Sequence, residues 1–300
     1  MQPRSTTPRG GGVLAAIDAG AAQLEVAGVA FGHGTDNAFD EAAWLVLWQL
    51  GLPLDTPLDG PDTVADQPLT PAQAAAIAAL FGRRIASRQP AAYLTHEAWL
   101  QGIAFYVDER AIVPRSFIAE LLVQGDIDSW LRPDTSRVLD LCTGNGSLAV
   151  IAAMAYPEVS VVAADISSAA LEVAQINVAK HGLQARVRLI ESDGLERVGT
   201  GYDLILCNPP YVNAQSMAAL PAEYRAEPEL ALAGGSDGMD FIRRLLGQAP
   251  AHMSENGVLV LEIGNEREHF EAAFGQLEAV WLETSAGADQ VLLLTRQALL

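Results

Sequence analysis

The segment "LILCNPPYVN" (204–213) places chemically useful groups directly after an apolar run. The run predicts a buried strand, and the two prolines end it because neither has a backbone N–H to donate. Asn208 then offers a side-chain carbonyl and Pro209 a rigid backbone carbonyl. Two fixed acceptors can bind both N–H groups of a planar amide or amine and so aim the face of its nitrogen at a methyl donor. The predicted catalytic residues are Asn208, Pro209, Pro210 and Tyr211.

Tyr211 is expected to stack on the flat target and shield it, while the prolines stiffen the acceptor pair. The alternative is an ordinary turn, because Asn-Pro commonly starts turns. We favour the catalytic interpretation because three further signals precede the motif in the same pattern of strands and helices.

The first signal is "VLDLCTGNGSLAVIAAMA", which reads as a strand, a glycine-containing turn and a helix. Gly144 and Gly146 let a ligand approach the backbone, and the start of the helix offers free N–H groups. The full G-x-G-x-x-G spacing of a dinucleotide site is missing. Asp140, at the end of the strand, could meet an ammonium group on the ligand.

The other two signals are aspartates at the ends of the next two strands. Asp165 in "VVAADIS" could accept hydrogen bonds from ribose hydroxyls. Helix capping is a weaker explanation, because Ser167 and Ser168 could supply the cap. Asp193 in "LIESDGL" could accept the exocyclic amine of adenine, although a loop aspartate is commonly only solvated.

S-Adenosyl-L-methionine fits both the nucleoside and the amino-acid features, whereas a nicotinamide cofactor explains only the ribose site. The candidate cofactor-binding residues are Asp140, Cys142, Thr143, Gly144, Asn145, Gly146, Asp165, Ile166, Ser192, Asp193, Gly194 and Asn208.

The region after Pro133 alternates strands with helices, which predicts an α/β fold with a doubly wound, mostly parallel sheet. The final two strands, 279–283 and 290–295, are too close in sequence for a parallel crossover and should be antiparallel. The other predicted strands are 137–141, 159–164, 187–190, 202–207 and 258–263, and the helices between them are 146–156, 168–181, 239–253 and 267–275.

The region before Pro133 is predicted to be mainly helical. Apolar spacing favours helices over 13–31 and 39–49, and Thr70-Pro71 is typical of a helix start, here running to Ser87. Short aromatic and β-branched runs in 91–115 predict a β-hairpin, and a further helix is expected over 116–130.

Composition limits the classes of function. The 300 residues are 50% hydrophobic, and 18 Lys and Arg stand against 37 Asp and Glu, for a net charge of −19. Such a surface repels nucleic-acid phosphates and attracts basic partners, although solubility explains it equally well. Two cysteines exclude a disulfide framework, and the scattered histidines lack the spacing of metal ligands. Without a convincing export signal or a membrane-spanning stretch, we expect a cytoplasmic protein.

The residues at 208–211, together with "VLDLCTGNG" and "AADIS", resemble the S-adenosylmethionine-dependent methyltransferases that modify planar nitrogens. These include adenine-specific DNA enzymes and protein-glutamine enzymes. The helical N-terminal region, the hairpin and "YRAEPELALAGGSDGMDFIRRLL" (224–246) look like the glutamine group. One branch of that group methylates peptide-release factors, and the other methylates a large-subunit ribosomal protein of the uL3 type. "FGHGTDNAFDEA" (31–42), "YLTHEAW" (93–99) and "VPRS" (113–116) match the ribosomal branch.

The resemblance implies a seven-stranded class I methyltransferase (Rossmann-like) sheet with an antiparallel last strand, plus a small helical domain. The implied domains are 1–90 for substrate recognition, 91–115 as a hairpin linker and 116–300 for methyl transfer. The implied activity is methylation of a glutamine side-chain amide (N5) in a basic large-subunit ribosomal protein. Asn145 departs from a small Ser or Thr, and Gly194 departs from a bulkier residue that packs on adenine in the release-factor branch.

Three alternatives are open. The same chemistry could act on release factors. DNA adenine N6-methylation is opposed by the charge, by the lack of a basic cluster near the motif and by the lack of a target-recognition insert, so no stable nucleic-acid binding is expected. A non-catalytic assembly factor is opposed by Asn208 and the intact glycines.

Cys142 and Cys207 are interpreted as packing residues. Arg115 could orient the hairpin, contact substrate or form a salt bridge.

Overall fold

The computed structural model describes residues 11–60 and 63–300, which divide into two compact units. The first, here called the helical unit, contains the chain up to His96 together with Pro221–Ala226. The second, the sheet unit, contains Glu97–Leu220 and Glu227–Leu300. The chain therefore leaves the sheet unit after Leu220 and returns to it at Glu227.

Local sequence signals fix the helix ends of the helical unit. Thr70 accepts from the backbone N–H of Gln73 while the Gln73 side chain accepts from the backbone of Thr70, a capping box that confirms the predicted start. The first helix ends at Ala27, before the predicted residue 31, because Gly28 takes a left-handed conformation. The elements of this unit are α1 (Val13–Ala27), α2 (Ala38–Leu50), η1 (Val64–Asp66), α3 (Pro71–Ser87), α4 (Ala91–Thr95) and α9 (Ala222–Arg225).

The predicted hairpin at 91–115 is much shorter in the structure. Only β1 (Ala98–Leu100) and β2 (Ile103–Phe105) pair, and α4 precedes them. The pairing stops because the backbone of Tyr106 bonds to a side chain instead of a strand: its N–H donates to Asn177 Oδ1 at 2.7 Å and its carbonyl accepts from Asn177 Nδ2 at 2.9 Å.

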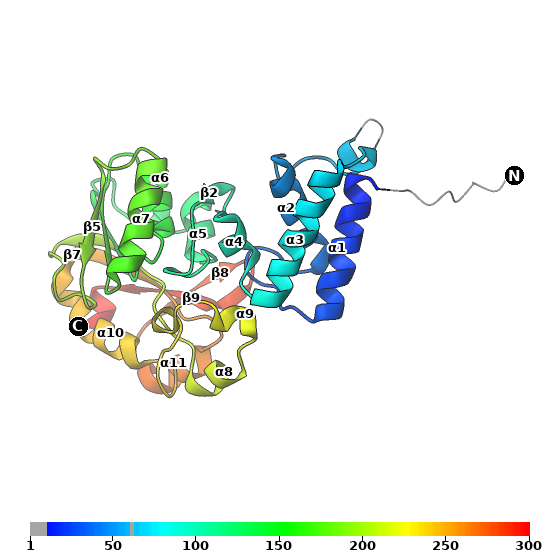
Figure 1. Cartoon of the computed structure of the whole chain (residues 1–300). Helices are drawn as coiled ribbons and strands as arrows, with labels where there is room; N and C mark the ends of the chain where they lie inside the picture. Colours follow the sequence, from blue (N-terminus) through cyan, green and yellow to red (C-terminus); the bar gives the residue numbers. More distant parts are fainter. Residues whose placement is uncertain (1–10, 61–62) are drawn as a thin grey trace, which may run out of the picture. The chain divides into compact units, whose positions relative to one another are not determined.

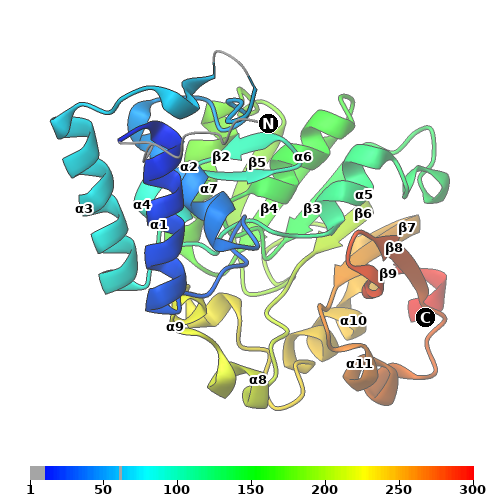
Figure 2. The same ribbon diagram turned by 90° about the vertical axis from the view of Figure 1, so that its right-hand side faces the viewer.

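The sheet unit is built on a seven-stranded sheet of order β5-β4-β3-β6-β7-β9-β8 (Figures 1 and 2). The first five are parallel, and β9 runs antiparallel to both of its neighbours. The predicted sheet and its antiparallel last strand are confirmed. The strands are β3 (Arg137–Leu141), β4 (Ser160–Asp165), β5 (Val187–Glu191), β6 (Tyr202–Cys207), β7 (Met253–Glu262), β8 (Val280–Thr284) and β9 (Gly287–Thr295).

Alternate residues of the strands feed two separate cores, one on each face of the sheet. Val138 and Leu204 pack with α5, α6 and α7, whereas Leu139 and Ile205 pack with α10 and α11. The predicted helix over 116–130 is interrupted after Gln124, where Gly125 again takes a left-handed conformation. The remaining helices are α5 (Ile118–Gln124), η2 (Asp128–Trp130), α6 (Ser147–Ala155), α7 (Ser168–Lys180), α8 (Ala214–Ala219), η3 (Glu229–Ala231), α10 (Asp240–His252), α11 (Arg267–Phe274) and η4 (Gln297–Leu299).

No helix in the described part of the chain has the length and apolar character needed to cross a membrane.

Candidate active site

The parallel strands β5, β4, β3 and β6 end at one edge of the sheet, and each predicted ligand-binding segment begins at such an end. The chain continues from β3 to β4 on one side and later adds β6 on the other, which makes this edge a topological switch point. A cavity of about 690 Å³ opens there. Its size is typical of a small-molecule site.

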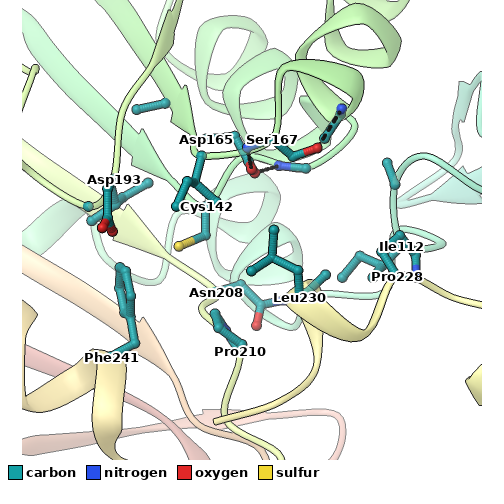
Figure 3. A pocket seen from close by; sticks show the side chains of 18 of the residues that line it. Ile112, Cys142, Asp165, Ser167, Asp193, Asn208, Pro210, Pro228, Leu230 and Phe241 are labelled. Atoms are coloured by element: carbon teal, nitrogen blue, oxygen red, sulfur yellow. Dashed lines mark hydrogen bonds between the residues drawn. The ribbon is translucent and has the colours of Figure 1, made fainter.

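Most of the predicted site residues meet around this cavity, although they come from four loops. Figure 3 shows Asp193 and Phe241 together in one part of the cavity, Asn208, Pro210 and Leu230 in another, and Cys142 between them. The predicted residues that line it are Cys142, Gly144, Asp165, Ile166, Ser192, Asp193, Gly194, Asn208 and Pro210. The predicted residues that do not line it are Asp140, Thr143, Asn145, Gly146, Pro209 and Tyr211.

Asp165 is held by the backbone of the neighbouring loops. Its Oδ2 accepts from the N–H of Gly144 at 2.8 Å, and its Oδ1 accepts from the N–H of Ser167 at 2.9 Å. Ser167, as expected, caps α7 by accepting from the N–H of Ala170. Burial raises the pKa of Asp165 despite these hydrogen bonds. Each oxygen keeps a second lone pair, so the carboxylate remains able to accept from a ligand hydroxyl.

Asp140 is fully buried beneath the loop that follows β3. Its Oδ2 accepts from Thr143 Oγ1 at 2.5 Å and from the N–H of Ala149 at 2.9 Å. Its Oδ1 has no hydrogen-bond partner among the described residues. Burial raises the pKa of Asp140 to about 7. The carboxyl group therefore fixes the turn that follows β3.

Asn145 serves the same loop through its own hydrogen bonds. Its Oδ1 accepts from the N–H of Ser147, and its backbone carbonyl accepts from Asn177 Nδ2 at 2.9 Å. With Asn in place of Ser or Thr, the side chain at this position still accepts from the N–H of Ser147, the first residue of α6. Gly146 faces α7: a Cβ there would lie 3.0 Å from the Cβ of Ala174.

Phe241 of α10 supplies an aromatic wall beside Gly194. A Cβ added at Gly194 would lie 3.8 Å from Phe241 Cε2, so the ring covers the place that a bulkier residue would occupy. Asp193 is not merely solvated, because Arg244 donates to its two oxygens at 2.9 and 3.3 Å. The Arg244 guanidinium also lies over the Phe241 ring, 5.5 Å from its centroid. The aromatic wall, absent from the sequence of this loop, comes instead from α10.

The Asn208 side chain reaches the cavity without a hydrogen-bond partner among the described residues. Leu230 lines the same cavity and is 58% exposed, although it is a large apolar residue. A partly exposed amide and an exposed leucine in one cavity are suited to a ligand that has both a polar and an apolar part.

Tyr211 does not line the cavity, whereas the sequence predicts that it stacks on the target. Its ring lies against Gly264, and its hydroxyl is 3.5 Å from Glu262 Oε1. Glu262 Oε2 accepts from Ser116 Oγ at 2.6 Å and from the N–H of Phe117 at 2.9 Å. Burial raises the pKa of Glu262 to about 7. The phenol therefore anchors the Asn208 loop to the end of β7.

Arg115 forms a two-pronged ion pair with Glu227, with both N–O distances at 2.7 Å. Glu227 also accepts from the N–H of Val113 at 2.9 Å. Of the possibilities weighed for Arg115, the structure shows the salt bridge. It joins two segments that line the cavity, one at Ile112 and the other at Pro228.

The two thiols do not form a nucleophilic site. Cys207 is buried, and both cysteines are free. A hydrogen bond with Cys207, followed by burial, raises the pKa of the Cys142 thiol well above its usual value. The thiolate is disfavoured, which agrees with a packing role.

Motif spacing did not identify several lining residues. They follow the Asn208 motif by many positions or precede β3, and only the fold brings them to the cavity. The sequence of 224–246 resembles the glutamine methyltransferases, but the resemblance does not indicate what the individual residues of this segment do. The missed lining residues include Ile112, Pro228, Glu229, Leu230, Asp240, Phe241 and Arg244.

Comparison with known proteins agrees with this geometry. Residues 120–223 match the methyltransferase small domain family. The hMettl16 catalytic domain bound to an RNA hairpin has a TM-score of 0.51 and 12% identity, covering 75% of this chain and 80% of that chain, so it shows the fold alone.

Two curated relatives cover most of the chain. The ribosomal protein uL3 glutamine methyltransferase of Bordetella pertussis is 55% identical over 280 residues, 92% of each chain. The protein of the same name from Neisseria meningitidis serogroup B is 50% identical over 276 residues, 91% of this chain and 89% of that one. These matches confirm the resemblance to the ribosomal branch. The chain therefore belongs to the family of methyltransferases that contains the ribosomal protein uL3 glutamine methyltransferases.

Proposed function

We propose that this protein transfers a methyl group from S-adenosyl-L-methionine to the side-chain amide nitrogen of a glutamine in ribosomal protein uL3. The observation that carries the proposal is the unpartnered Asn208 amide in a cavity that also contains an aromatic wall and a ribose-type carboxylate. The names of the relatives support this choice of substrate.

The residues of the cavity fit the cofactor. Phe241 and Ile166 offer apolar surface to an adenine ring, and Asp165 can accept from ribose hydroxyls. Asp193 can accept the adenine amine while it remains paired with Arg244. Asp140, which does not line the cavity, acts by holding the turn that carries Gly144. When bound, S-adenosyl-L-methionine supplies an electrophilic methyl carbon on a positively charged sulfur.

The Asn208 loop would orient the glutamine amide. The Asn208 side-chain carbonyl would accept one N–H of the substrate. We assign the other N–H to the backbone carbonyl of Pro209, which lies between the cavity-lining Asn208 and Pro210 without lining the cavity itself. Held in this way, the amide nitrogen would be aimed at the methyl carbon that the cofactor supplies, and the extra proton on the nitrogen would pass to solvent after the transfer. Orientation and electrostatics thus provide the rate enhancement, and Tyr211 acts by holding the loop.

The state of the substrate is a second part of the proposal. With a net charge of −19, the enzyme favours a basic protein and repels ribosomal RNA. We therefore assign the reaction to free uL3 in the cytoplasm, before or early in assembly, with residues 1–90 recognising the substrate. A mature large subunit that is methylated faster than free uL3 would refute this assignment.

One assay separates the candidate substrates. Purified enzyme and labelled S-adenosyl-L-methionine are incubated in parallel with uL3, a peptide-release factor and duplex DNA, and mass spectrometry locates the modified residue. We expect label on one glutamine of uL3 alone. Label on the release factor would support the other branch, and label on adenine would support the DNA class.

A further inference from the structure

Residues 228–231, here called the Leu230 wall, line the cavity, and α9 lies in the segment between the Asn208 motif and this wall. Residues Pro221–Ala226 belong to the helical unit, whereas the residues on both sides of them belong to the sheet unit. After α9, the chain returns at Glu227 and at once lines the cavity with Pro228, Glu229, Leu230 and Ala231. Only Glu227 separates the end of this insertion from the first residue that lines the cavity.

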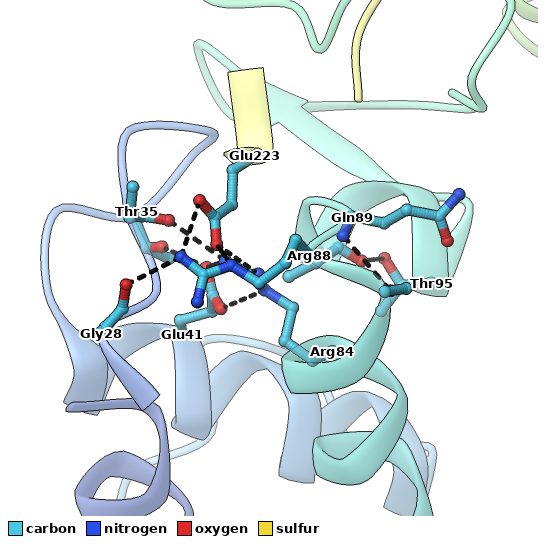
Figure 4. Close-up of polar contacts among 11 residues, drawn as sticks. Gly28, Thr35, Glu41, Arg84, Arg88, Gln89, Thr95 and Glu223 are labelled. Carbon is cyan, nitrogen blue, oxygen red and sulfur yellow. Dashed lines mark hydrogen bonds and ion pairs between the residues drawn. The ribbon is translucent and has the colours of Figure 1, made fainter. Parts of the chain in front are cut away.

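Glu223 of α9 is the centre of a buried charge cluster in the helical unit (Figure 4). The side chains of Glu223 and Arg84 are both fully buried, and Arg84 Nη1 lies 3.3 Å from Glu223 Oε1. Arg88 Nε lies 2.7 Å from the same oxygen. Arg84 Nε also donates to Glu41 Oε1 at 2.7 Å. The cluster therefore joins α9, α3 and α2 through two carboxylates and two guanidinium groups.

The two arginines also bind the chain that follows α1. Arg84 Nη2 donates to the carbonyl of Ala30 at 3.1 Å, and Arg88 donates to the carbonyls of Ala27 and Gly28 at 3.0 and 2.7 Å. Cations at these positions are favoured because the last carbonyls of a helix carry partial negative charge. The arginines are thus held in place independently of Glu223.

The segment 31–42, whose sequence matches the ribosomal branch, contacts α9 through Tyr224, the residue next to Glu223. The Tyr224 ring lies 4.2 Å from the ring of His33, and its hydroxyl would be 2.3 Å from a Cβ at Gly32. Thr35 Oγ1 lies 3.5 Å from Glu41 Oε2 in the same cluster. This signature and the segment around Glu223 therefore form one structure, which neither cofactor binding nor methyl transfer explains.

The charge balance of the cluster favours an ionised Glu223. Burial opposes its ionisation, but hydrogen bonds from its own backbone N–H and from Arg88 and Arg84 outweigh burial and lower its pKa. At Glu41, burial outweighs Arg84 and raises the pKa. Removing the charge of Glu223 would leave the buried Arg84 with a poorer partner, which is a costly change in a protein interior.

We propose that Glu223, Arg84 and Arg88 are positioning residues through which the helical unit holds the Leu230 wall in place for the protein substrate. This inference rests on the proposed function. It assigns the cluster to the protein-substrate step because the chain after Leu230 is hydrogen-bonded to the chain after Asn208, where Val212 donates to the carbonyl of Leu232 at 2.9 Å. Cofactor binding is expected to be independent of the cluster.

The test compares Glu223→Gln with Glu25→Gln, which makes the same charge change on an exposed position of α1. We expect Glu223→Gln to lower kcat/KM for uL3 on the order of 10- to 100-fold, mainly through KM, because one partner of a buried ion pair is neutralised. The Kd of S-adenosylhomocysteine should change by less than about threefold. Glu25→Gln should match the unaltered protein.

Two further measurements keep the test decisive if Glu223→Gln folds poorly. Arg88→Gln alters a partner whose side chain is 28% exposed, and it should change KM in the same direction by a smaller factor. Hydrogen exchange should become faster at the amides of Ala231 and Leu232 in both variants. It should stay unchanged in β3 and β4.

The outcomes separate this inference from the proposed function. If the unaltered protein does not methylate uL3, the proposed function is wrong. If it does, and Glu223→Gln and Arg88→Gln keep the original kcat/KM, the positioning role is wrong. An equal loss of cofactor affinity and of kcat/KM would also refute it, because the cluster would then act on the whole sheet unit.

Discussion

Asn208 combines two properties at the scale of single residues. It directly follows a buried strand, and its amide has no hydrogen-bond partner among the described residues. A polar side chain at such a place is usually satisfied by its neighbours unless a ligand completes it. The rigid Pro209-Pro210 pair then restricts where that ligand can bind.

Replacing Asn208 by Ala removes one of the two acceptors for the substrate amide. We expect the single-turnover rate of methyl transfer to fall on the order of 10²–10³-fold, by analogy with the loss of one oxyanion-hole donor. Binding of S-adenosylhomocysteine should be nearly unchanged. Asn256→Ala, an exposed position outside the site, is the matched control. A rate equal to that of the unaltered protein would contradict the proposed mechanism.

Phe241→Ala removes the aromatic wall beside Gly194. Stacking of a base on an aromatic ring contributes roughly 1–3 kcal/mol, so the Kd of S-adenosylhomocysteine should rise about 5- to 150-fold. Calorimetric titration measures the change. Phe241→Tyr keeps the ring and should keep the affinity. Equal affinity in the Ala variant would show that the ring does not contact adenine.

Glu262→Gln tests the buried carboxyl group behind Tyr211. Its pKa is raised to about 7 in the folded protein from 4.5 in the unfolded chain. The folded state therefore holds this proton more tightly. The contribution of the protonated Glu262 carboxyl group to the free energy of unfolding is therefore fully present below pH 4.5, and it is lost as the pH rises through 7.

Urea unfolding at several pH values measures that contribution. The stability of the unaltered protein relative to Glu262→Gln should decline between those pH values, by at most about 3 kcal/mol. A difference that does not vary with pH would indicate an ordinary pKa at Glu262.

At the scale of elements, the Asn208 loop is held by the chain that precedes α10. Val212 donates to the carbonyl of Leu232 at 2.9 Å, and Gly234 donates to the carbonyl of Val212 at 2.9 Å. A Cβ on Gly234 would lie 2.7 Å from the Cα and carbonyl carbon of Tyr211. Gly234 and Gly238 of "GGSDG" thus make room for the backbone of Tyr211 in the Asn208 loop.

Gly234→Ala should displace that backbone and lower kcat/KM at least about tenfold, since small misplacements of reacting groups are costly. Gly247 in α10 is the matched control, because a Cβ there meets no atom within 4 Å. Gly247→Ala should keep full activity and raise stability by roughly 0.5–1 kcal/mol. Activity assays and urea unfolding of both variants measure these effects. Full activity in Gly234→Ala would show that the loop tolerates a shift.

At the scale of the whole molecule, the net charge of −19 would attract the basic substrate that we propose. Long-range attraction speeds association and is screened by salt. We expect kcat/KM for uL3 to fall steadily from low to physiological salt while kcat stays constant. The Kd of S-adenosylhomocysteine, measured in the same buffers, should change little. If kcat/KM is independent of salt, the acidic surface serves solubility alone.

The sequence by itself determined the features that depend on local patterns. Alternating apolar runs fixed the strands, the short connection before 290–295 fixed an antiparallel end, and Thr70-Pro71 fixed a helix start. The strand-end residues Asp165, Asp193 and Asn208 were identified because parallel strands bring their carboxyl ends together.

The tertiary structure decided whatever depends on partners distant in the sequence. The hairpin is short because Tyr106 meets Asn177. Tyr211 does not line the cavity, and its hydroxyl lies near Glu262 instead. Phe241 reaches Gly194 from α10, and Glu223 reaches Arg84 although 139 positions separate them. Local patterns record the repeat of a helix or a strand, whereas these contacts depend on how the elements pack and carry no periodic signal.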